Sequence, residues 1–183
     1  MTSQNPDTGD NSGRRKRIYI VDVTNRDGVQ TSRLGLAKLE KTMLNIFLDE
    51  MGIWQSEFGF PTTRHESNYL QANLELVERG AIPHTRLSGW VRAVASDVQQ
   101  ARELVPQLKY INISISTSDQ MIQGKWNGRY RFDDVVNLMI EALQAARELG
   151  FERIGVNAED ASRTSEEHLV EFTLAAKEHG AAR

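Results

Sequence analysis

Residues 18–31 read IYIVDVTNRDGVQT, and they set the pattern that the rest of the chain repeats. A short run of β-branched and aromatic residues passes directly into polar ones, with Arg26 and Asp27 side by side before Gly28. Runs of this kind favour a buried strand, and a glycine lets the backbone turn sharply behind it. The stretch therefore predicts a strand at 18–23 whose carboxyl end carries a cation and a carboxylate.

The same pattern returns four times downstream. Further strands are predicted over residues 53–58, 86–91, 110–116 and 152–157. Apolar residues at three- and four-residue spacing predict helices between and after them, over residues 36–51, 69–78, 96–104, 132–149 and 166–179. We expect Ser96 to cap the third helix, and glycines to end four of the five, namely Gly52, Gly80, Gly150 and Gly180. Strands that alternate with helices in this way predict a parallel sheet with right-handed crossovers.

Polar side chains stand at the predicted carboxyl ends of all five strands. Glu57 ends the second strand among apolar residues, where a buried charge needs a partner, and Arg26 is the expected one. Arg92 ends the third strand, Ser114 lies on a polar face of the fourth, and Glu159 ends the fifth. A (β/α)₈ barrel places its active site at these ends. The sequence contains no glycine-rich nucleotide-binding loop, which would have favoured a doubly wound sheet.

The predicted fold class is therefore α/β, a partial TIM (β/α)₈ barrel with about five βα units and parallel strands. A complete eight-stranded barrel takes about 250 residues, whereas this chain has 183. Residues 1–16 are polar and are predicted to form a disordered tail. Residues 17–183 are predicted to be the amino-terminal part of one barrel domain.

Composition excludes several classes of function. The chain has 22 Lys and Arg residues against 25 Asp and Glu, so its net charge of −3 lacks the basic excess of a nucleic-acid-binding protein. It has no apolar run of about 18 residues and no apolar segment near Met1 typical of a secretory signal. Cysteine is absent, which excludes thiolate metal sites and a Cys nucleophile. We expect a cytoplasmic protein with neither nucleic acid nor membrane as a partner.

Four motifs resemble one known superfamily. They are D-V-T-N-R-D-G-V-Q-T (22–31), S-E-F-G-F-P (56–61), S-T-S-D (116–119) and A-E-D-A-S-R (158–163). Together they resemble the DRE-TIM metallolyases, in particular the Claisen-condensing branch with a pyruvate carboxyltransferase-type domain. That branch contains the 2-isopropylmalate, homocitrate, citramalate and Re-type citrate synthases. Asp27, Arg26 and Glu57 match the Asp–Arg–Glu constellation after which the superfamily is named, and the resemblance covers about residues 18–183.

This resemblance implies an activity and cofactors. The reaction joins the methyl carbon of acetyl-CoA to the ketone of a 2-oxo acid and then hydrolyses the thioester. A divalent metal ion (Mg, Mn or Zn) acts as the Lewis acid, and Asp27 would be one of its ligands. Arg26 would bind the 2-oxo acid and stabilise the enolate, while Glu57 would orient Arg26 or contact the substrate.

The remaining implied roles concern substrate binding. Arg92 would lie near the substrate carboxylate, Ser114 and Glu159 would line the pocket, and Gln30 would support the first loop. Lys125 falls where some members carry a lysine, but we interpret it as a solvated loop residue.

The sequence also departs from the family pattern. Met121 stands where a histidine is usual, and Asn25 stands where leucine is common. The family's second metal-binding motif, His-x-His, is absent, because no two of the four histidines are separated by one residue: His65, His84, His168 and His179. We expect all four to be surface or structural residues. The metal site is thus predicted to be incomplete in this chain, and no convincing general base is present.

Three interpretations of the incomplete barrel stay open. The chain is half of a split synthase completed by a partner subunit, or a truncated product that is inactive alone, or a reduced, non-catalytic relative that dimerises through its open edge. Two alternatives to the synthase function also stay open. One is a lyase that cleaves a hydroxyacyl-CoA, and the other is a module that binds a 2-oxo acid or a partner chain without catalysis.

Overall fold

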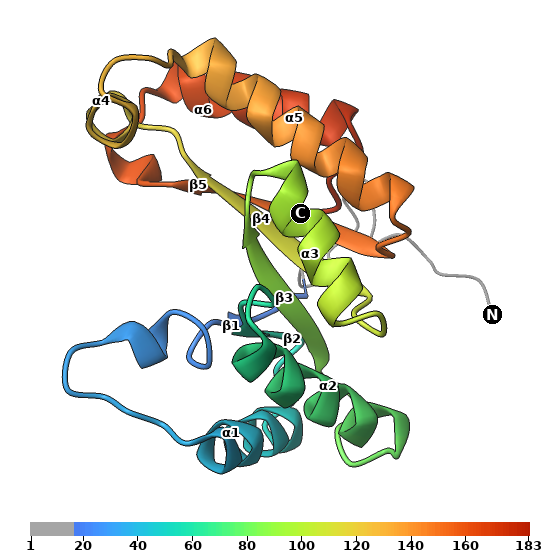
Figure 1. Ribbon diagram of the computed structural model, residues 1–183. Coiled ribbons are helices and arrows are strands. Elements are labelled where there is room, and N and C mark those ends of the chain that lie inside the picture. Colours follow the sequence, from blue (N-terminus) through green and yellow to red (C-terminus); the bar gives the residue numbers. More distant parts are fainter. Residues whose placement is uncertain (1–16) are drawn as a thin grey trace.

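Five parallel strands form one sheet in the order β1-β2-β3-β4-β5, and the sheet curls into about half a barrel (Figure 1). The computed structural model describes residues 17–183, so the predicted disorder of residues 1–16 lies outside the described residues. The strands are β1 (Val21–Asp22), β2 (Gln55–Gly59), β3 (Arg86–Arg92), β4 (Tyr110–Ser116) and β5 (Arg153–Glu159). The predicted partial (β/α)₈ barrel is therefore confirmed.

Helices follow the strands and cover the convex side of the sheet. They are α1 (Lys38–Glu50), α2 (Arg64–Glu78), α3 (Ala95–Leu104), α4 (Asp119–Trp126), α5 (Phe132–Glu148) and α6 (Glu166–Glu178), with short 3₁₀ turns η1 (Gly28–Gln30) and η2 (Ala161–Arg163). No helix in the described range is long and apolar enough to cross a membrane. The four predicted glycine stops are confirmed, since each of these glycines has a positive φ directly beyond its helix: Gly52, Gly80, Gly150 and Gly180.

The two faces of the sheet differ in chemistry because side chains alternate along each strand. The outward residues of β4, for example Ile111 and Ile113, are fully buried against the helices and belong to one continuous apolar core. The inward residues are polar or large, as Asn112, Ser114 and Ser116 show. The core therefore holds the convex side together and leaves the concave side free to carry chemistry.

Two local predictions were wrong, and one helix was missed. The first strand pairs only over Val21–Asp22, because it lies at an edge of the described sheet, and Ile18 and Ile20 stay exposed. Ser96 is not a cap, since α3 begins one residue earlier and Val94 occupies the N-cap position. Helix α4 was not predicted, because its eight residues lack a strong apolar period.

Candidate functional site

The carboxyl ends of β1 and β2 bring Arg26 and Glu57 together. Glu57 is 2% exposed, and its Oε2 accepts hydrogen bonds from Arg26 Nε at 3.1 Å and Nη2 at 2.9 Å. Its other oxygen, Oε1, accepts a hydrogen bond of 2.6 Å from Asn112 Nδ2 on β4. The expected pairing of the buried Glu57 carboxylate with Arg26 is thus confirmed, and Asn112 completes it.

Arg26 is also fixed on its remaining sides. Its Nη1 donates to Asp27 Oδ1 at 2.8 Å, and its guanidinium carbon lies 4.9 Å from the ring centroid of Trp90. Trp90 in turn packs edge-on against Phe60 at 5.1 Å. An arginine has five N–H donors, and three of them are used by the two carboxylates. The other two N–H groups have no acceptor among residues 17–183, which leaves them available to an anionic group.

Asp27 faces solvent beside this pair. Its side chain is 60% exposed, and among the described residues its carboxylate accepts a hydrogen bond only from Arg26. Residues 17–183 contain no group of three or more His, Cys, Asp or Glu side chains that could hold a metal ion. A divalent cation needs about two or three more protein ligands than Asp27. The described residues therefore do not make a complete metal centre, and the role of Asp27 as a metal ligand stays a prediction.

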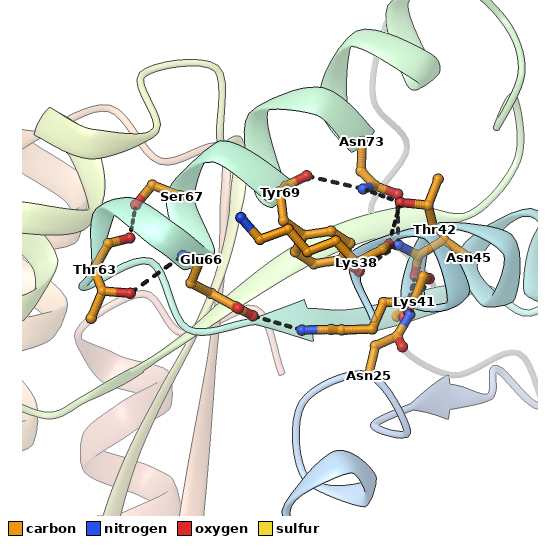
Figure 2. Close-up of polar contacts among 11 residues, drawn as sticks. Asn25, Lys38, Lys41, Thr42, Asn45, Thr63, Glu66, Ser67, Tyr69 and Asn73 are labelled. Atoms are coloured by element: carbon orange, nitrogen blue, oxygen red, sulfur yellow. Dashed lines mark hydrogen bonds and ion pairs between the residues drawn. The ribbon is translucent and has the colours of Figure 1, made fainter. Parts of the chain in front are cut away.

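A polar network anchors the loop that carries Arg26. Asn25 is fully buried, and its Nδ2 donates to the Lys41 carbonyl and to Asn45 Oδ1, both at 2.8 Å. Asn45 Nδ2 donates onward to Tyr69 Oη and Asn73 Oδ1, both at 2.9 Å. Figure 2 shows how these side chains, which come from the loop, α1 and α2, point toward one another. An apolar residue at position 25 could not make these hydrogen bonds. Asn25, which stands where leucine is common in the family, is therefore stabilised by its hydrogen bond to Asn45.

An ion pair closes the same network next to the loop. Lys41 is almost fully buried, and its Nζ lies 2.7 Å from Glu66 Oε1 and 4.3 Å from the Tyr69 ring centroid (Figure 2). Burial raises the pKa of the Tyr69 hydroxyl well above its usual range. Tyr69 is thus held neutral and acts as an acceptor for Asn45. The network joins the two helices that flank the first loop.

A second polar group lies at the ends of β4 and β5. Lys125 Nζ contacts Ser116 Oγ at 2.6 Å and Glu159 Oε2 at 2.9 Å, and Ser116 donates to the same carboxylate oxygen at 2.8 Å. Partial burial of Glu159 opposes its ionisation, but the hydrogen bonds from Lys125 and Ser116 outweigh that effect and hold the pKa of the carboxyl below its usual value. The interpretation of Lys125 as a solvated loop lysine was wrong about the loop, since Lys125 lies on α4, although its side chain is 43% exposed. Its helix was not predicted, and its partner Glu159 is 34 residues away in sequence.

The other predicted site residues are placed as follows. Ser114 is buried on the inner face and pairs in register with Arg92 and Asn157. Arg92 is exposed and turns to the start of α3, where its Nε and Nη2 donate to the two oxygens of Asp97 at 2.7 and 2.8 Å. Gln30 is exposed at the end of η1. The structure therefore joins Arg26, Asp27 and Glu57 in one cluster and leaves Arg92 and Gln30 outside it.

The histidines lie as expected. His65 and His84 are exposed. The ring of His168 stacks on Phe132 at 3.8 Å, and His179 Nδ1 lies 2.8 Å from the Ala175 carbonyl oxygen.

Trp90 and Asn112 were not assigned a role from the sequence. The signal for Asn112 was present, because polar residues alternate along 112–116. The contact of Trp90 with Arg26 depends on the curl of the sheet, and no local pattern in the sequence carries that information.

A parallel βα half-barrel with an arginine–carboxylate cluster at the carboxyl ends of its strands defines a class of enzyme domain with its site on that rim. Comparison with known proteins gives the family. Residues 17–183 match the HMGL-like family, and the chain belongs to it. This membership confirms the resemblance to the DRE-TIM superfamily drawn from the motifs.

Three curated relatives show where within the family the similarity lies. The chain is 61% identical over 167 residues to citrate (Re)-synthase of Dehalococcoides mccartyi, covering 91% of this chain and 40% of that protein. It is 39% identical to 2-isopropylmalate synthase 2 of Caldanaerobacter subterraneus subsp. tengcongensis, covering 92% of this chain and 41% of that protein. It is 32% identical to homocitrate synthase AksA of Methanocaldococcus jannaschii, covering 92% and 39% respectively. The chain thus spans about 40% of the length of these relatives.

Solved structures agree on the fold. The HMG-CoA lyase of Bacillus subtilis superposes with a TM-score of 0.65 at 14% identity, covering 91% of this chain and 56% of that one. The HMG-CoA lyase of Brucella melitensis gives 0.63 at 17% identity, covering 91% and 59%. At these identities the likeness concerns the fold alone.

Proposed function

We propose that this chain carries part of the active site of an acyltransferase that condenses acetyl-CoA with a 2-oxo acid, and that oxaloacetate is the first acid to test. The observation that carries the proposal is the Arg26 guanidinium, which two carboxylates and Trp90 hold in place while two of its N–H groups find no acceptor among residues 17–183. The 61% identity to a citrate (Re)-synthase supports oxaloacetate, because citrate is the product of joining an acetyl group to that acid.

The proposed chemistry assigns a task to each residue of the cluster. The two unused N–H groups of Arg26 bind a carboxylate or a developing oxyanion of the substrate, where a fixed donor is worth most. Glu57 and Asn112 keep the guanidinium oriented, so that it needs no rearrangement when charge develops. Asp27 offers one oxygen to a divalent cation, whose role would be to polarise the ketone. Ser114 and Glu159 line the pocket, and Gln30 and Arg92 are peripheral contributors.

Further strands are part of the proposal. The described residues provide five strands and one proposed metal ligand, and we assign no general base among them, so we infer that the remaining ligands and strands come from polypeptide outside this sequence. A complementary subunit and a longer form of the same chain are both consistent with this requirement. The cytoplasmic location stays a prediction.

The decisive experiment measures thiol release from acetyl-CoA in the presence of Mn²⁺. This chain is mixed with the portion of the D. mccartyi relative that it does not match, and oxaloacetate, pyruvate, 2-oxoglutarate and 2-oxoisovalerate are offered in turn. We expect release with oxaloacetate only in the mixture, loss of this Mn²⁺-dependent release in Asp27→Ala, and no effect of Arg79→Gln, an exposed position directly after α2. Absence of release with all four acids would refute the proposal.

The non-catalytic alternative has a different signature. A module that only binds 2-oxo acids would give heat on calorimetric titration with oxaloacetate, but no thiol release in the mixture. The lyase alternative is not favoured by any contact in the site, since the same arginine would serve both directions of the reaction.

A further inference from the structure

A second charged site lies at the opposite end of the strands from Arg26. Arg86 is the first residue of β3, Arg153 is the first residue of β5, and Trp54 directly precedes β2. These residues line a cavity of about 270 Å³ together with Tyr19, Val21 and Arg183. Arg86 alternates with Ser88 and Trp90, so it lies on the same concave face as the candidate site.

The arginines of this cavity lack counter-charges. The guanidinium carbons of Arg86 and Arg153 lie 4.8 and 5.2 Å from the Trp54 ring centroid. Within residues 17–183, neither arginine has a carboxylate oxygen within 4.0 Å, and Arg183 reaches only Glu57, at 3.8 Å. Burial, followed by the positive charges of Arg86 and Arg183, lowers the pKa of Arg153. The cavity therefore has an unbalanced positive charge.

The geometry of the sheet indicates what covers this cavity. The last two residues run beside β5 in a parallel ladder, since Ala182 N donates to Ile154 O and Val156 N donates to Arg183 O, both at 2.8 Å. This pairing occupies the edge of β5 that faces away from β4, so a further strand placed beside it would extend the sheet. The interior of a closed (β/α)₈ barrel is filled by side chains from all its strands, so the cavity becomes buried when further strands are added. Burying a guanidinium without a partner is strongly unfavourable.

We propose that the concave face docks a polypeptide segment that supplies further barrel strands, and that this segment carries inward-facing Asp or Glu side chains which pair with Arg86 and Arg153. The inference rests on the requirement for further strands made under the proposed function, and it adds the charge that those strands must bring.

A second copy of this chain does not fit the same face. It would bring its own Arg86, Arg153 and Arg183 to the same level, and facing like charges oppose association. A small anion would neutralise the arginines, but it would leave the edge of β5 beyond Val156 and the exposed side chains of Ile18 and Ile20 uncovered. The positive charge of the arginines and the uncovered part of the sheet edge together favour an acidic polypeptide as the partner of this face.

The test is an affinity measurement that needs no substrate. The chain is titrated with the unmatched portion of the D. mccartyi citrate (Re)-synthase, and Kd is followed by calorimetry for the wild type, Arg86→Gln, Arg153→Gln and the control Arg79→Gln. Arg79 directly follows α2, is 78% exposed and pairs only loosely with Glu75 at 3.9 Å. We expect Kd to rise at least tenfold for Arg86→Gln and Arg153→Gln, because each leaves a carboxylate buried without its partner, and to stay within twofold for Arg79→Gln.

Two controls distinguish an effect on docking from an effect on folding or on activity: circular dichroism and the thiol-release assay. Circular dichroism of the isolated variants is expected to match the wild type, because removing one of several like charges does not weaken the fold. Docking that depends on the arginines without any thiol release would refute the proposed activity and keep this inference. No complex, or a complex with the same Kd in all variants, would overturn the inference. Arginine-dependent binding of phosphate or malonate to the chain alone, with docking unaffected, would overturn it in favour of a small-anion site.

Discussion

At the scale of single residues, the orientation of Arg26 is set by what surrounds it. Glu57 is buried and satisfied on both oxygens, by Arg26 on one and by Asn112 on the other. A buried carboxylate is tolerated only when it is paired and hydrogen-bonded. Arg26 therefore has a structural task as well as the proposed chemical one.

This dual task predicts a loss of stability in Arg26→Gln. The variant leaves the Glu57 carboxylate buried without its cation, so we expect the free energy of unfolding in urea to fall by about 3 kcal/mol. Arg79→Gln removes an exposed, loose pair and is expected to change it by less than about 0.5 kcal/mol. Equal stability of the two variants would show that the Arg26–Glu57 pair does not hold the loop.

The pair between Lys125 and Glu159 predicts a dependence on pH. The pKa of Glu159 is lower in the folded chain than its ordinary value of 4.5. Its contribution to stability is thus present above that pH and is lost as the pH falls through the lowered pKa. Because both side chains are partly exposed, we expect Lys125→Met to destabilise the chain by about 0.5–1 kcal/mol at pH 7.

The check is thermal unfolding of wild type and Lys125→Met between pH 7 and pH 3. The difference between the two proteins should shrink toward zero at the acidic end. Lys38→Met is the control, because Lys38 has no carboxylate partner among residues 17–183. A difference that is the same at pH 7 and pH 3 would contradict the assignment.

At the scale of secondary-structure elements, β4 and β5 approach closely where the inner face carries Asn112. Gly155 pairs in register with Asn112, and a Cβ at this glycine would lie 2.2 Å from Asn112 Oδ1. The side chain of Asn112 would have to move, and its hydrogen bond to Glu57 would be lost. Glycine is therefore needed here for space rather than for an unusual φ.

Gly155→Ala is accordingly predicted to lower the free energy of unfolding by about 1–3 kcal/mol, the range for a steric clash or an unsatisfied buried polar group. The matched control is Gly124→Ala, since Gly124 lies within α4 and a Cβ there meets nothing within 4 Å. That change is expected to stabilise by about 0.5–1 kcal/mol. Urea denaturation of both variants tests this prediction. The free energy of unfolding is expected to fall for Gly155→Ala and to rise for Gly124→Ala.

The elements also show what the sequence could predict. β4 was predicted at its observed bounds, because 110–116 alternates clearly and its outward residues are isoleucines. Helix α4 was missed, since Gly124 and few apolar residues weaken its period, and with it the contact of Lys125 to Glu159. The pairing of Glu57 with Arg26 could be predicted because a buried charge needs a partner. The direction of the Arg92 side chain could not be predicted, because it forms an ion pair with Asp97 on the next helix, α3, and turns away from the candidate site.

At the scale of the whole molecule, one helix face stands out by its exposure. Four apolar side chains follow one another at four-residue spacing along α1 and its C-cap, and they are between 41% and 73% exposed: Leu39, Met43, Phe47 and Met51. Side chains spaced in this way share one face of a helix. Contiguous exposed apolar surface of this kind marks a contact with another polypeptide. In the described part of the chain nothing covers it.

This stripe predicts that the isolated chain self-associates. We expect sedimentation velocity to show a larger mean mass as the concentration rises, because burying the stripe removes apolar surface from water. The double variant Met43→Lys/Phe47→Lys should remain monomeric over the same range without a lower free energy of unfolding, since both side chains are already exposed. Reversal of association by the unmatched portion of the D. mccartyi relative would show that the stripe belongs to the barrel contact. Association that is equal in wild type and double variant would instead place the contact elsewhere, with the edge of β1 and the edge of β5 beyond Val156 next to be tested.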